Sequence, residues 1–253
     1  MVIGYAQPGK ARSFQVLEAF TAGCGGRVAQ RPVLEDGDVA FYGTLGLEWM
    51  VRQVRAEGRT FYFGDNSFFD AGRGRFFRFA RDAFQVHEKM PPDHGRLAAL
   101  GVKIRPWAAG GRHIVVVEQS EHFLELSGIG KHWLVRVLAD MRRYTDRPLV
   151  VRRWRRDKAK AASTLAADLR GAWALVTHMS AAANEALIAG VPAFVSGLCA
   201  ATPMASGELS KIESPNRPDG REDWAAGLAG AQWTLGELRD GTAWRGLNDH
   251  QPG

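Results

Sequence analysis

Short, uninterrupted apolar runs recur along the chain and are separated by longer segments with helical spacing. The runs that best fit buried strands are Val2–Tyr5, Val39–Tyr42, Thr60–Phe63, Arg112–Glu118, Leu149–Val151, Ala174–Val176 and Ala193–Val195. Apolar runs of this length without alternation are typical of strands that are covered on both faces, as in parallel sheets. The pattern therefore predicts an α/β fold in which helices connect parallel strands.

Two of the intervening segments have a clear amphipathic pattern. The segment 11–22 is predicted to be a helix that places Phe14, Leu17 and Phe20 in the core, and the segment 131–144 a helix with Leu134, Val135, Val137, Leu138 and Met141 inward. A further short helix is predicted after Thr234, because Thr234 and Glu237 have the spacing of a capping box.

The order of these elements predicts two Rossmann-like parallel-sheet domains. The segment 1–100 is predicted to form an N-terminal domain, and 101–232 a C-terminal domain. The double proline at Pro91 and Pro92 suits a crossing between them. The remainder, 233–253, is predicted to be a C-terminal helix and tail.

The segment from Ala174 to Ser196 carries the strongest functional pattern. It is predicted to form a strand, a polar turn, a small-residue helix, a Gly-x-Pro stop and a second strand, which is one βαβ unit. Ser180 is predicted as the N-cap, so that free amides of the first helical turn face an anionic ligand above the sheet. His178 in the turn is a candidate phosphate or sugar contact, and Glu185 is placed to reach a ribose hydroxyl.

Asp65 is the candidate catalytic residue. It is predicted to follow a buried strand directly, at the carboxyl end of the first sheet, beside Phe68 and Phe69. A partly desolvated carboxylate there suits a general base. The alternative is that Asp65 and Asn66 cap a turn.

The charge balance adds a possible partner. The net charge is +6 and the sequence pI is about 9.6, which suits a polyanion such as nucleic acid. Basic residues interleave with aromatic ones at Arg73, Arg75, Arg78 and Arg81, a pattern that fits contacts with DNA or, equally, a half-buried strand. The densest basic run begins at Arg152, where Arg152 and Lys158 are candidates to hold a diphosphate, although an Arg-rich surface is the default explanation.

Several classes are disfavoured. The His87–Glu88 pair lacks the spacing of a zinc helix, and the two cysteines have neither partner pattern, so we expect no metal site and no disulfide. No apolar run has the length of a membrane span and no signal peptide is evident, so we expect a soluble cytoplasmic protein. A dinucleotide-dependent oxidoreductase is disfavoured because no G-x-G-x-x-G follows the first strand.

The segment Ala174–Ser196 resembles the donor-binding segment of GT-B-type glycosyltransferases, in which a strand, a Ser or Thr, a helix with Glu and a Gly-x-Pro recur. The segment from Gly64 to Arg81 and the ending from Gln232 to Trp244 are similar to segments of phage-encoded and capsule-type members. The resemblance implies a compact GT-B-like fold, with two Rossmann-like domains facing a cleft. It also implies that 1–100 binds the acceptor and that 101–232 binds the nucleotide sugar.

The resemblance also implies the function. We expect a hexosyl- or N-acetylhexosaminyltransferase that uses a nucleotide sugar, a UDP-sugar above all, with no further cofactor. The expected acceptor is 5-hydroxymethylcytosine or 5-hydroxymethyluracil in bacteriophage DNA, with a monomer acting on double-stranded DNA in the host cytoplasm. The alternatives are a capsule or lipopolysaccharide transferase and a non-enzymatic nucleic-acid-binding α/β module.

Overall fold

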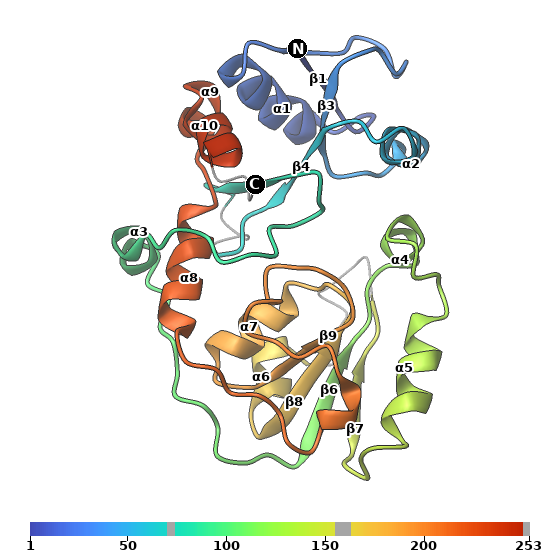
Figure 1. Ribbon diagram of the computed structural model, residues 1–253, viewed down its shortest axis with the longest axis vertical. Coiled ribbons are helices and arrows are strands. Elements are labelled where there is room, and N and C mark those ends of the chain that lie inside the picture. Colours follow the sequence, from blue (N-terminus) through green and yellow to red (C-terminus); the bar gives the residue numbers. More distant parts are fainter. Residues whose placement is uncertain (70–73, 155–162, 250–253) are drawn as a thin grey trace. The chain divides into compact units, whose positions relative to one another are not determined.

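The structure is a computed structural model that describes residues 1–69, 74–154 and 163–249. The chain divides into two compact units, each built around one sheet (Figure 1). The first unit contains 1–86, 90–100 and 226–253, and the second contains 87–89 and 101–225. The prediction of an α/β fold with parallel sheets is confirmed.

The first sheet has five strands in the order β2-β1-β3-β4-β5. Their bounds are β1 Val2–Tyr5, β2 Arg27–Val28, β3 Asp38–Tyr42, β4 Phe61–Asn66 and β5 Phe77–Arg81. The first four strands are parallel, whereas β5 pairs antiparallel with β4, with Asp65 opposite Arg78. The chain moves outward from β1 to β2 and in the other direction from β3 to β4, so the switch point lies between β1 and β3.

The helices of the first unit come from both ends of the chain. They are α1 Ala11–Gly23, α2 Glu48–Ala56, α3 His94–Ala99, α9 Leu235–Arg239 and α10 Thr242–Asp249, while α8 Arg221–Gly230 spans both units. One core cluster joins α1 and the sheet to the C-terminal segment through Phe20, Tyr62, Phe79, Trp233 and Leu238. Phe20 and Phe79 stack with ring centroids 4.2 Å apart.

The C-terminal segment is tied to the first sheet by backbone and side-chain bonds. Trp233 and Phe77 exchange two backbone hydrogen bonds of 2.7 Å, which extends the pairing beyond β5. Asn248 accepts hydrogen bonds from Tyr62 and Arg81 at 3.1 and 3.0 Å. The predicted capping box between Thr234 and Glu237 is confirmed at the start of α9. These contacts complete the core of the first unit with residues from the far end of the chain.

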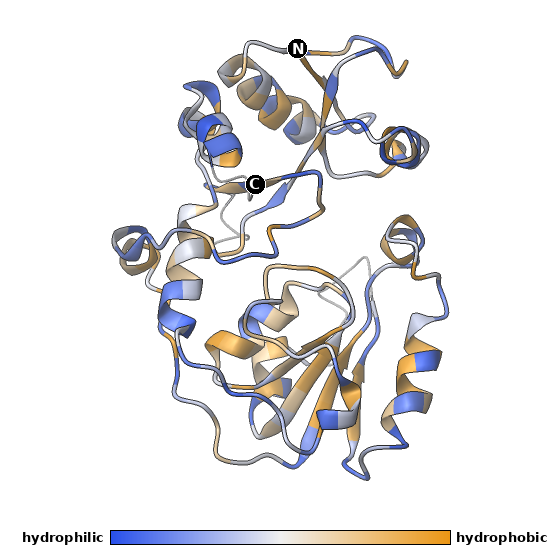
Figure 2. Cartoon of the chain, viewed as in Figure 1, coloured by the Kyte–Doolittle hydropathy of each residue, from blue (hydrophilic) through white to orange (hydrophobic). Residues whose placement is uncertain are grey.

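The second sheet is entirely parallel, in the order β7-β6-β8-β9. Its strands are β6 His113–Val117, β7 Leu149–Arg152, β8 Ala172–Thr177 and β9 Ala193–Val195. Both β6 and β8 are largely buried, and Figure 2 shows the strands of this sheet mostly in the orange of hydrophobic residues. The chain moves from β6 to β7 in one direction and from β8 to β9 in the other, which places the switch point between β6 and β8.

Helices cover the second sheet on both faces. Their bounds are α4 Glu121–Leu126, α5 Trp133–Met141, α6 Leu165–Leu169, α7 Ala182–Ile188 and the short 3-10 helix η2 Leu209–Lys211. The helices α4 and α5 lie on one side of the sheet, and α6 and α7 lie on the other (Figure 1). Ile114, Val116 and Val176 form the core with Trp133 and Met141.

Two predicted core positions are wrong. Phe14 is 49% exposed and Val135 is 67% exposed. The stripe that α1 buries instead runs through Val16, Leu17 and Phe20, and α5 buries Leu134, Val137 and Met141. An apolar residue on the solvent side of a helix is common, so hydrophobicity alone did not fix the buried face.

Candidate functional site

The candidate site in the second unit is the second switch point, which we define as the residues directly after β6 and β8. Ligands of open α/β sheets bind at the carboxyl ends of the strands where the strand order reverses. Here those ends carry polar groups, Glu118 and Gln119 after β6, and His178 and Ser180 after β8.

Two hydrogen bonds join the strand ends at this point. The Thr177 hydroxyl donates to the carbonyl of Val117 at 2.8 Å. The side-chain oxygen of Gln119 accepts from the backbone amide of Met179 at 2.7 Å. Together they hold the loop after β8 against the loop after β6, so the turn that precedes α7 has one defined shape.

Ser180 lies in this turn, but the prediction that it is the N-cap of the helix is wrong. The N-cap of α7 is Ala181, whose side chain cannot cap. The Ser180 hydroxyl accepts a 3.3 Å hydrogen bond from the amide of Ala182. Among the described residues, no acceptor engages the backbone amides of Ser180 and Ala181, so these two donors remain for a ligand.

Glu185 lies on the exposed side of α7. The helix has only seven residues, so its dipole adds little to the site beyond these two amides. The predicted contact between Glu185 and a ribose hydroxyl stays a prediction.

His178 is buried and bonded on both sides of its ring. Its Nδ1 lies 2.9 Å from the Ser196 hydroxyl, and its Nε2 lies 3.1 Å from the Ser127 hydroxyl. Trp133 donates to the same Ser196 oxygen at 2.9 Å, and Ser127 donates to the carbonyl of Leu124 at 3.0 Å. A neutral ring that accepts at Nδ1 and donates at Nε2 satisfies the whole chain of bonds.

Burial lowers the pKa of His178, because the charged ring loses its hydration. The ring is therefore neutral, and its two hydrogen bonds hold the start of the turn after β8 in place. Its two nitrogens are both engaged, so a direct contact with phosphate or sugar requires one of these bonds to break.

Arg152 is at the end of β7 and is engaged within the unit. Its guanidinium forms an ion pair with Asp168 and donates to the hydroxyl and carbonyl of Ser163. Asp168 is largely buried, with 12% of its side chain exposed. A diphosphate would have to share this guanidinium with Asp168. Lys158, the other predicted diphosphate ligand, lies outside the described residues.

Glu118 is a site residue that the sequence analysis missed. It follows β6 directly, and its carboxylate accepts a 3.0 Å hydrogen bond from the amide of Trp154 and lies 3.7 Å from Arg153. Glu118 thus anchors the start of the basic run after β7 at the second switch point. The signal was present, since a carboxylate directly after a buried strand is the pattern that singled out Asp65.

The first switch point comprises the residues directly after β1 and β3. With its amide oriented to satisfy both contacts, Gln7 accepts from the amides of Thr44 and Leu45 at 3.1 and 2.8 Å. Gly43 has a φ of +70°, and a Cβ there would come within 2.6 Å of the Gln7 side chain. The Ser13 hydroxyl links the same loops, because it accepts from the amide of Gln7 and donates to the carbonyl of Tyr42.

Asp65 lies within β4 and not after it, so the predicted end of this strand is wrong by three residues. Its carboxylate forms a 2.9 Å ion pair with Arg78 on β5, and 41% of the Asp65 side chain is exposed. The Arg78 side chain is only 9% exposed and also donates to the carbonyls of Asn66 and Phe84. Arg78 therefore orients Asp65, and its burial does not suit a residue that pairs with DNA phosphates.

The other members of the basic series differ in their surroundings. Arg81 bonds to Asn248 at 3.0 Å and lies 3.4 Å from Asp82. Arg75 is exposed, with its guanidinium 5.9 Å from the ring centroid of Phe76. Arg73 lies outside the described residues. Arg78 and Arg81 thus have partners inside the first unit.

The described residues contain neither a metal-binding cluster nor a membrane-crossing helix. No group of three or more His, Cys, Asp or Glu within 1–69, 74–154 and 163–249 is arranged to hold a metal ion. None of the helices in these ranges has both the length and the apolar character that a membrane crossing requires.

Comparison with known proteins gives a likeness in fold. No family model matches the sequence, and no curated protein matches it. Among solved structures, the chain is similar to the beta Kdo 2,7 transferase of KpsC from Thermosulfurimonas dismutans, with a TM-score of 0.53, 13% identity and 99% of both chains covered. It is also similar to the beta Kdo 2,4 transferase of the same KpsC, with a TM-score of 0.51, 13% identity and 90% of both chains covered. At this identity the likeness establishes the fold alone, a GT-B-like α/β fold with two parallel-sheet units.

Proposed function

We propose that this protein is a glycosyltransferase that takes a sugar from a nucleotide donor bound at the second switch point. The observation that carries the proposal is the likeness of fold to a Kdo transferase over 99% of both chains. The second switch point adds to it, because a fixed turn there presents the free amides of Ser180 and Ala181 at the edge where such sheets bind ligands.

The proposed chemistry needs few groups. The sugar moves from the donor to an acceptor hydroxyl, a base takes the hydroxyl proton, and the nucleotide leaves with the electron pair of the broken bond. We assign the leaving phosphate to the two amides and to the basic run that begins at Arg152, and the ribose to Glu185. Asp65 is the proposed base, since Arg78 holds its carboxylate in one orientation and leaves part of it exposed.

We propose a glycan hydroxyl as the acceptor, because both structural neighbours are Kdo transferases of a KpsC protein. The hydroxymethylated-DNA acceptor has less support. The first unit contains 14 lysines and arginines against 13 aspartates and glutamates, so it has little excess positive charge for a DNA backbone. Its Arg78 and Arg81 also have partners within the protein.

The test is to incubate the protein with a panel of nucleotide sugars that includes UDP-hexoses, UDP-N-acetylhexosamines and an activated Kdo. Acceptors are a Kdo-containing oligosaccharide and 5-hydroxymethylcytosine DNA, and products are measured by mass spectrometry. A sugar-sized mass gain on the oligosaccharide supports the proposal. A mass gain on the DNA alone would mean that the acceptor is DNA and not a glycan. If no donor binds and no acceptor gains mass, the non-enzymatic nucleic-acid-binding module is the remaining interpretation.

Two variants test the assigned roles. Asp65→Asn keeps the size of the side chain and removes the base, so turnover should fall by about 10²–10⁴-fold while donor affinity stays close to wild type. Glu185→Ala should weaken donor binding and leave the fold intact, since the residue is exposed. A fully active Asp65→Asn protein would remove Asp65 from the mechanism, and Glu88→Ala provides a control for loss of a carboxylate elsewhere.

A further inference from the structure

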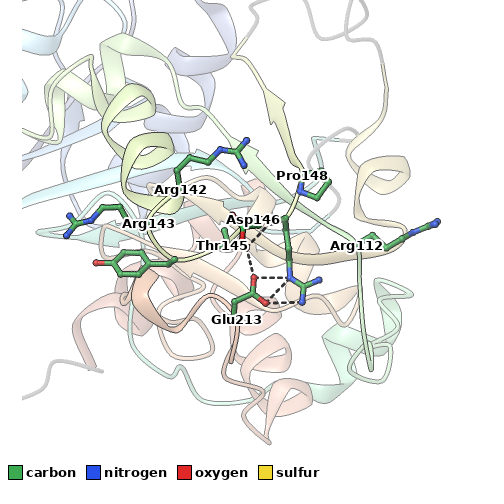
Figure 3. Close-up of a pocket in the computed structure, with 9 residues that line it drawn as sticks. Arg112, Arg142, Arg143, Thr145, Asp146, Pro148 and Glu213 are labelled. Carbon is green, nitrogen blue, oxygen red and sulfur yellow. Dashed lines mark hydrogen bonds and ion pairs between the residues drawn. The ribbon is translucent and has the colours of Figure 1, made fainter.

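A concave surface of about 580 Å³ lies at the amino-terminal edge of the second sheet, away from the second switch point (Figure 3). Arg112 directly precedes β6, and Pro148 directly precedes β7, so both belong to this edge. The strand β6 has five residues, which separates the two edges by roughly 16 Å at 3.3 Å per residue. We call this surface the arginine pocket, after its lining residues Arg112, Arg142, Arg143 and Arg147.

The centre of the arginine pocket is a fixed ion pair. Arg147 lies 2.9 Å from Glu213, donates to the carbonyl of Gly111 at 2.7 Å, and places its guanidinium 4.0 Å from the ring centroid of Trp173. Thr145 donates a further hydrogen bond to Glu213. These contacts lower the pKa of Glu213, first through the hydrogen bond from Arg147 and then through that from Thr145. The charges of Arg147 and Glu213 therefore compensate each other.

The rim has an excess of positive charge. Arg112 and Arg142 are exposed, and none of the residues in 1–69, 74–154 and 163–249 forms an ion pair with either. Arg143 has 71% of its side chain exposed and makes a marginal 3.9 Å contact with Asp140. Figure 3 shows these three side chains spread around Glu213, with Arg112 on the far side from Arg142 and Arg143.

We propose that the arginine pocket binds a small anion that carries two or more phosphate groups. A guanidinium matches the geometry of phosphate oxygens and loses little hydration when it binds them. The spread of the rim arginines favours an anion with several charged groups over a single phosphate. The volume lies within the range of about 300–1,000 Å³ of small-molecule sites, and half-exposed Tyr144 adds an aromatic face.

The arginine pocket is not the main source of positive charge in the second unit, because 152–160 alone contains six lysines and arginines against one aspartate. The second unit contains 19 lysines and arginines against 14 aspartates and glutamates, so it carries +5 of the net +6. The arginine pocket is distinct from the proposed donor site, because the two lie at opposite edges of the same sheet. A failure of the glycosyltransferase proposal would therefore leave this one standing, and the reverse also holds.

Calorimetric titration with inorganic tripolyphosphate tests the proposal on the full chain. Arg112→Ala and Arg142→Ala should each weaken binding by roughly threefold to fivefold, as expected for exposed charge pairs, and the double variant by about tenfold or more. The matched control is Arg52→Ala, which removes an exposed arginine of α2 in the first unit and should leave the affinity unchanged. Arg153→Ala removes an arginine of the proposed donor site at the opposite edge and reports any anion that binds there. Loss of binding in Arg153→Ala with full binding in the double variant would place the anion elsewhere and overturn the proposal.

Three further outcomes are decisive. Tripolyphosphate should bind more tightly than inorganic phosphate, and its affinity should fall as sodium chloride is raised from 0.05 to 0.3 M, because salt screens exposed charges. Absence of tripolyphosphate binding to the wild-type chain at low salt overturns the proposal. Arg112→Lys with Arg142→Lys retains the charge and should restore most of the affinity, which separates a lost contact from a damaged fold.

Discussion

In both switch points a glutamine side chain joins two loops by accepting hydrogen bonds from backbone amides, but the two switch points differ in the amides that remain available to a ligand. Gln7 lies two residues after β1 and accepts amides from the loop after β3, and Gln119 lies two residues after β6 and accepts an amide from the loop after β8. The amide partners, Thr44 and Met179, each lie two residues after their own strand. The same glutamine therefore joins the same two loops in both units.

The two switch points differ in the number of backbone amides to which the glutamine is bonded. Gln7 accepts hydrogen bonds from two backbone amides, and Ser13 links the same loops. The polar groups of the first switch point are therefore bonded to one another. Gln119 takes one amide, and those of Ser180 and Ala181 stay open. A switch point thus becomes a binding site when its loops are held in place without consuming the donors that a ligand needs.

The largest expected effect is the unfolding of the first unit while the second unit stays folded. Ending the chain after Gly230 removes α9 and α10, including buried Trp233, Leu238 and Leu247. Buried side chains of this kind contribute about 2–5 kcal/mol each, which together exceeds much of the roughly 5–15 kcal/mol that stabilises a domain. Hydrogen exchange should show β4 unprotected and β6 still protected.

The control for that truncation ends the chain after Asp249. It removes only residues beyond α10, and both strands should then exchange as in the full chain. Protection of β4 in the shorter chain would mean that the first unit folds without its C-terminal helices.

The glutamines give the next largest effect. Gln7→Ala removes the acceptor of two amides, those of buried Thr44 and exposed Leu45, and Gln119→Ala removes the acceptor of the amide of buried Met179. Loss of the acceptor costs about 1–3 kcal/mol at a buried amide and less at an exposed one. We expect denaturant unfolding to show a greater loss for Gln7→Ala. The matched controls Gln7→Glu and Gln119→Glu keep an accepting oxygen and should recover most of the stability. Equal losses in the two alanine variants would contradict the proposed difference between the switch points.

A smaller effect is expected at weakly acidic pH, in the free energy of unfolding of the second unit. His178 has a lowered pKa in the folded protein, so below pH 6.5 the unfolded chain binds more protons at this residue. Its contribution to stability is present above pH 6.5 and is lost as the pH falls through the folded-state pKa. The free energy of unfolding of the second unit should decrease from pH 7.5 to pH 5, and His178→Gln should flatten that slope.

The smallest effect belongs to Glu213. Its folded-state pKa is lowered below the ordinary value of 4.5, so its contribution is present above pH 4.5 and is lost as the pH falls through the folded-state pKa. The side chain is 44% exposed, so solvent screening limits the contribution to under about 1 kcal/mol. Glu213→Gln should reduce stability slightly at pH 7 and have no effect at pH 3, as measured by urea unfolding.

The sequence predicted the elements that its local pattern determines. The buried runs at β6, β8 and β9 and the capping box at α9 were found, because each depends on residues that are close in the chain. The position of His178 and Ser180 in the loop after β8 was also predicted, whereas their roles in binding stay predictions.

The partners of the site residues could not be predicted. Gln119 and Met179 are separated by 60 positions, and Asp65 meets Arg78 only because β5 turns back against β4. Similarly, the apolar positions of α9 and α10 do not reveal that they complete a core begun by α1. Such pairings follow from the tertiary fold, and no local pattern encodes them.

The return of the last helices to the first sheet sets the order in which the protein can mature during synthesis. The 125 residues from Gly101 to Ala225 must leave the ribosome before the first core can close. At about 5–20 residues per second this takes roughly 6–25 s, a long interval in which the apolar face of α1 and the sheet has no cover. The unit whose synthesis begins first is therefore the last to be completed.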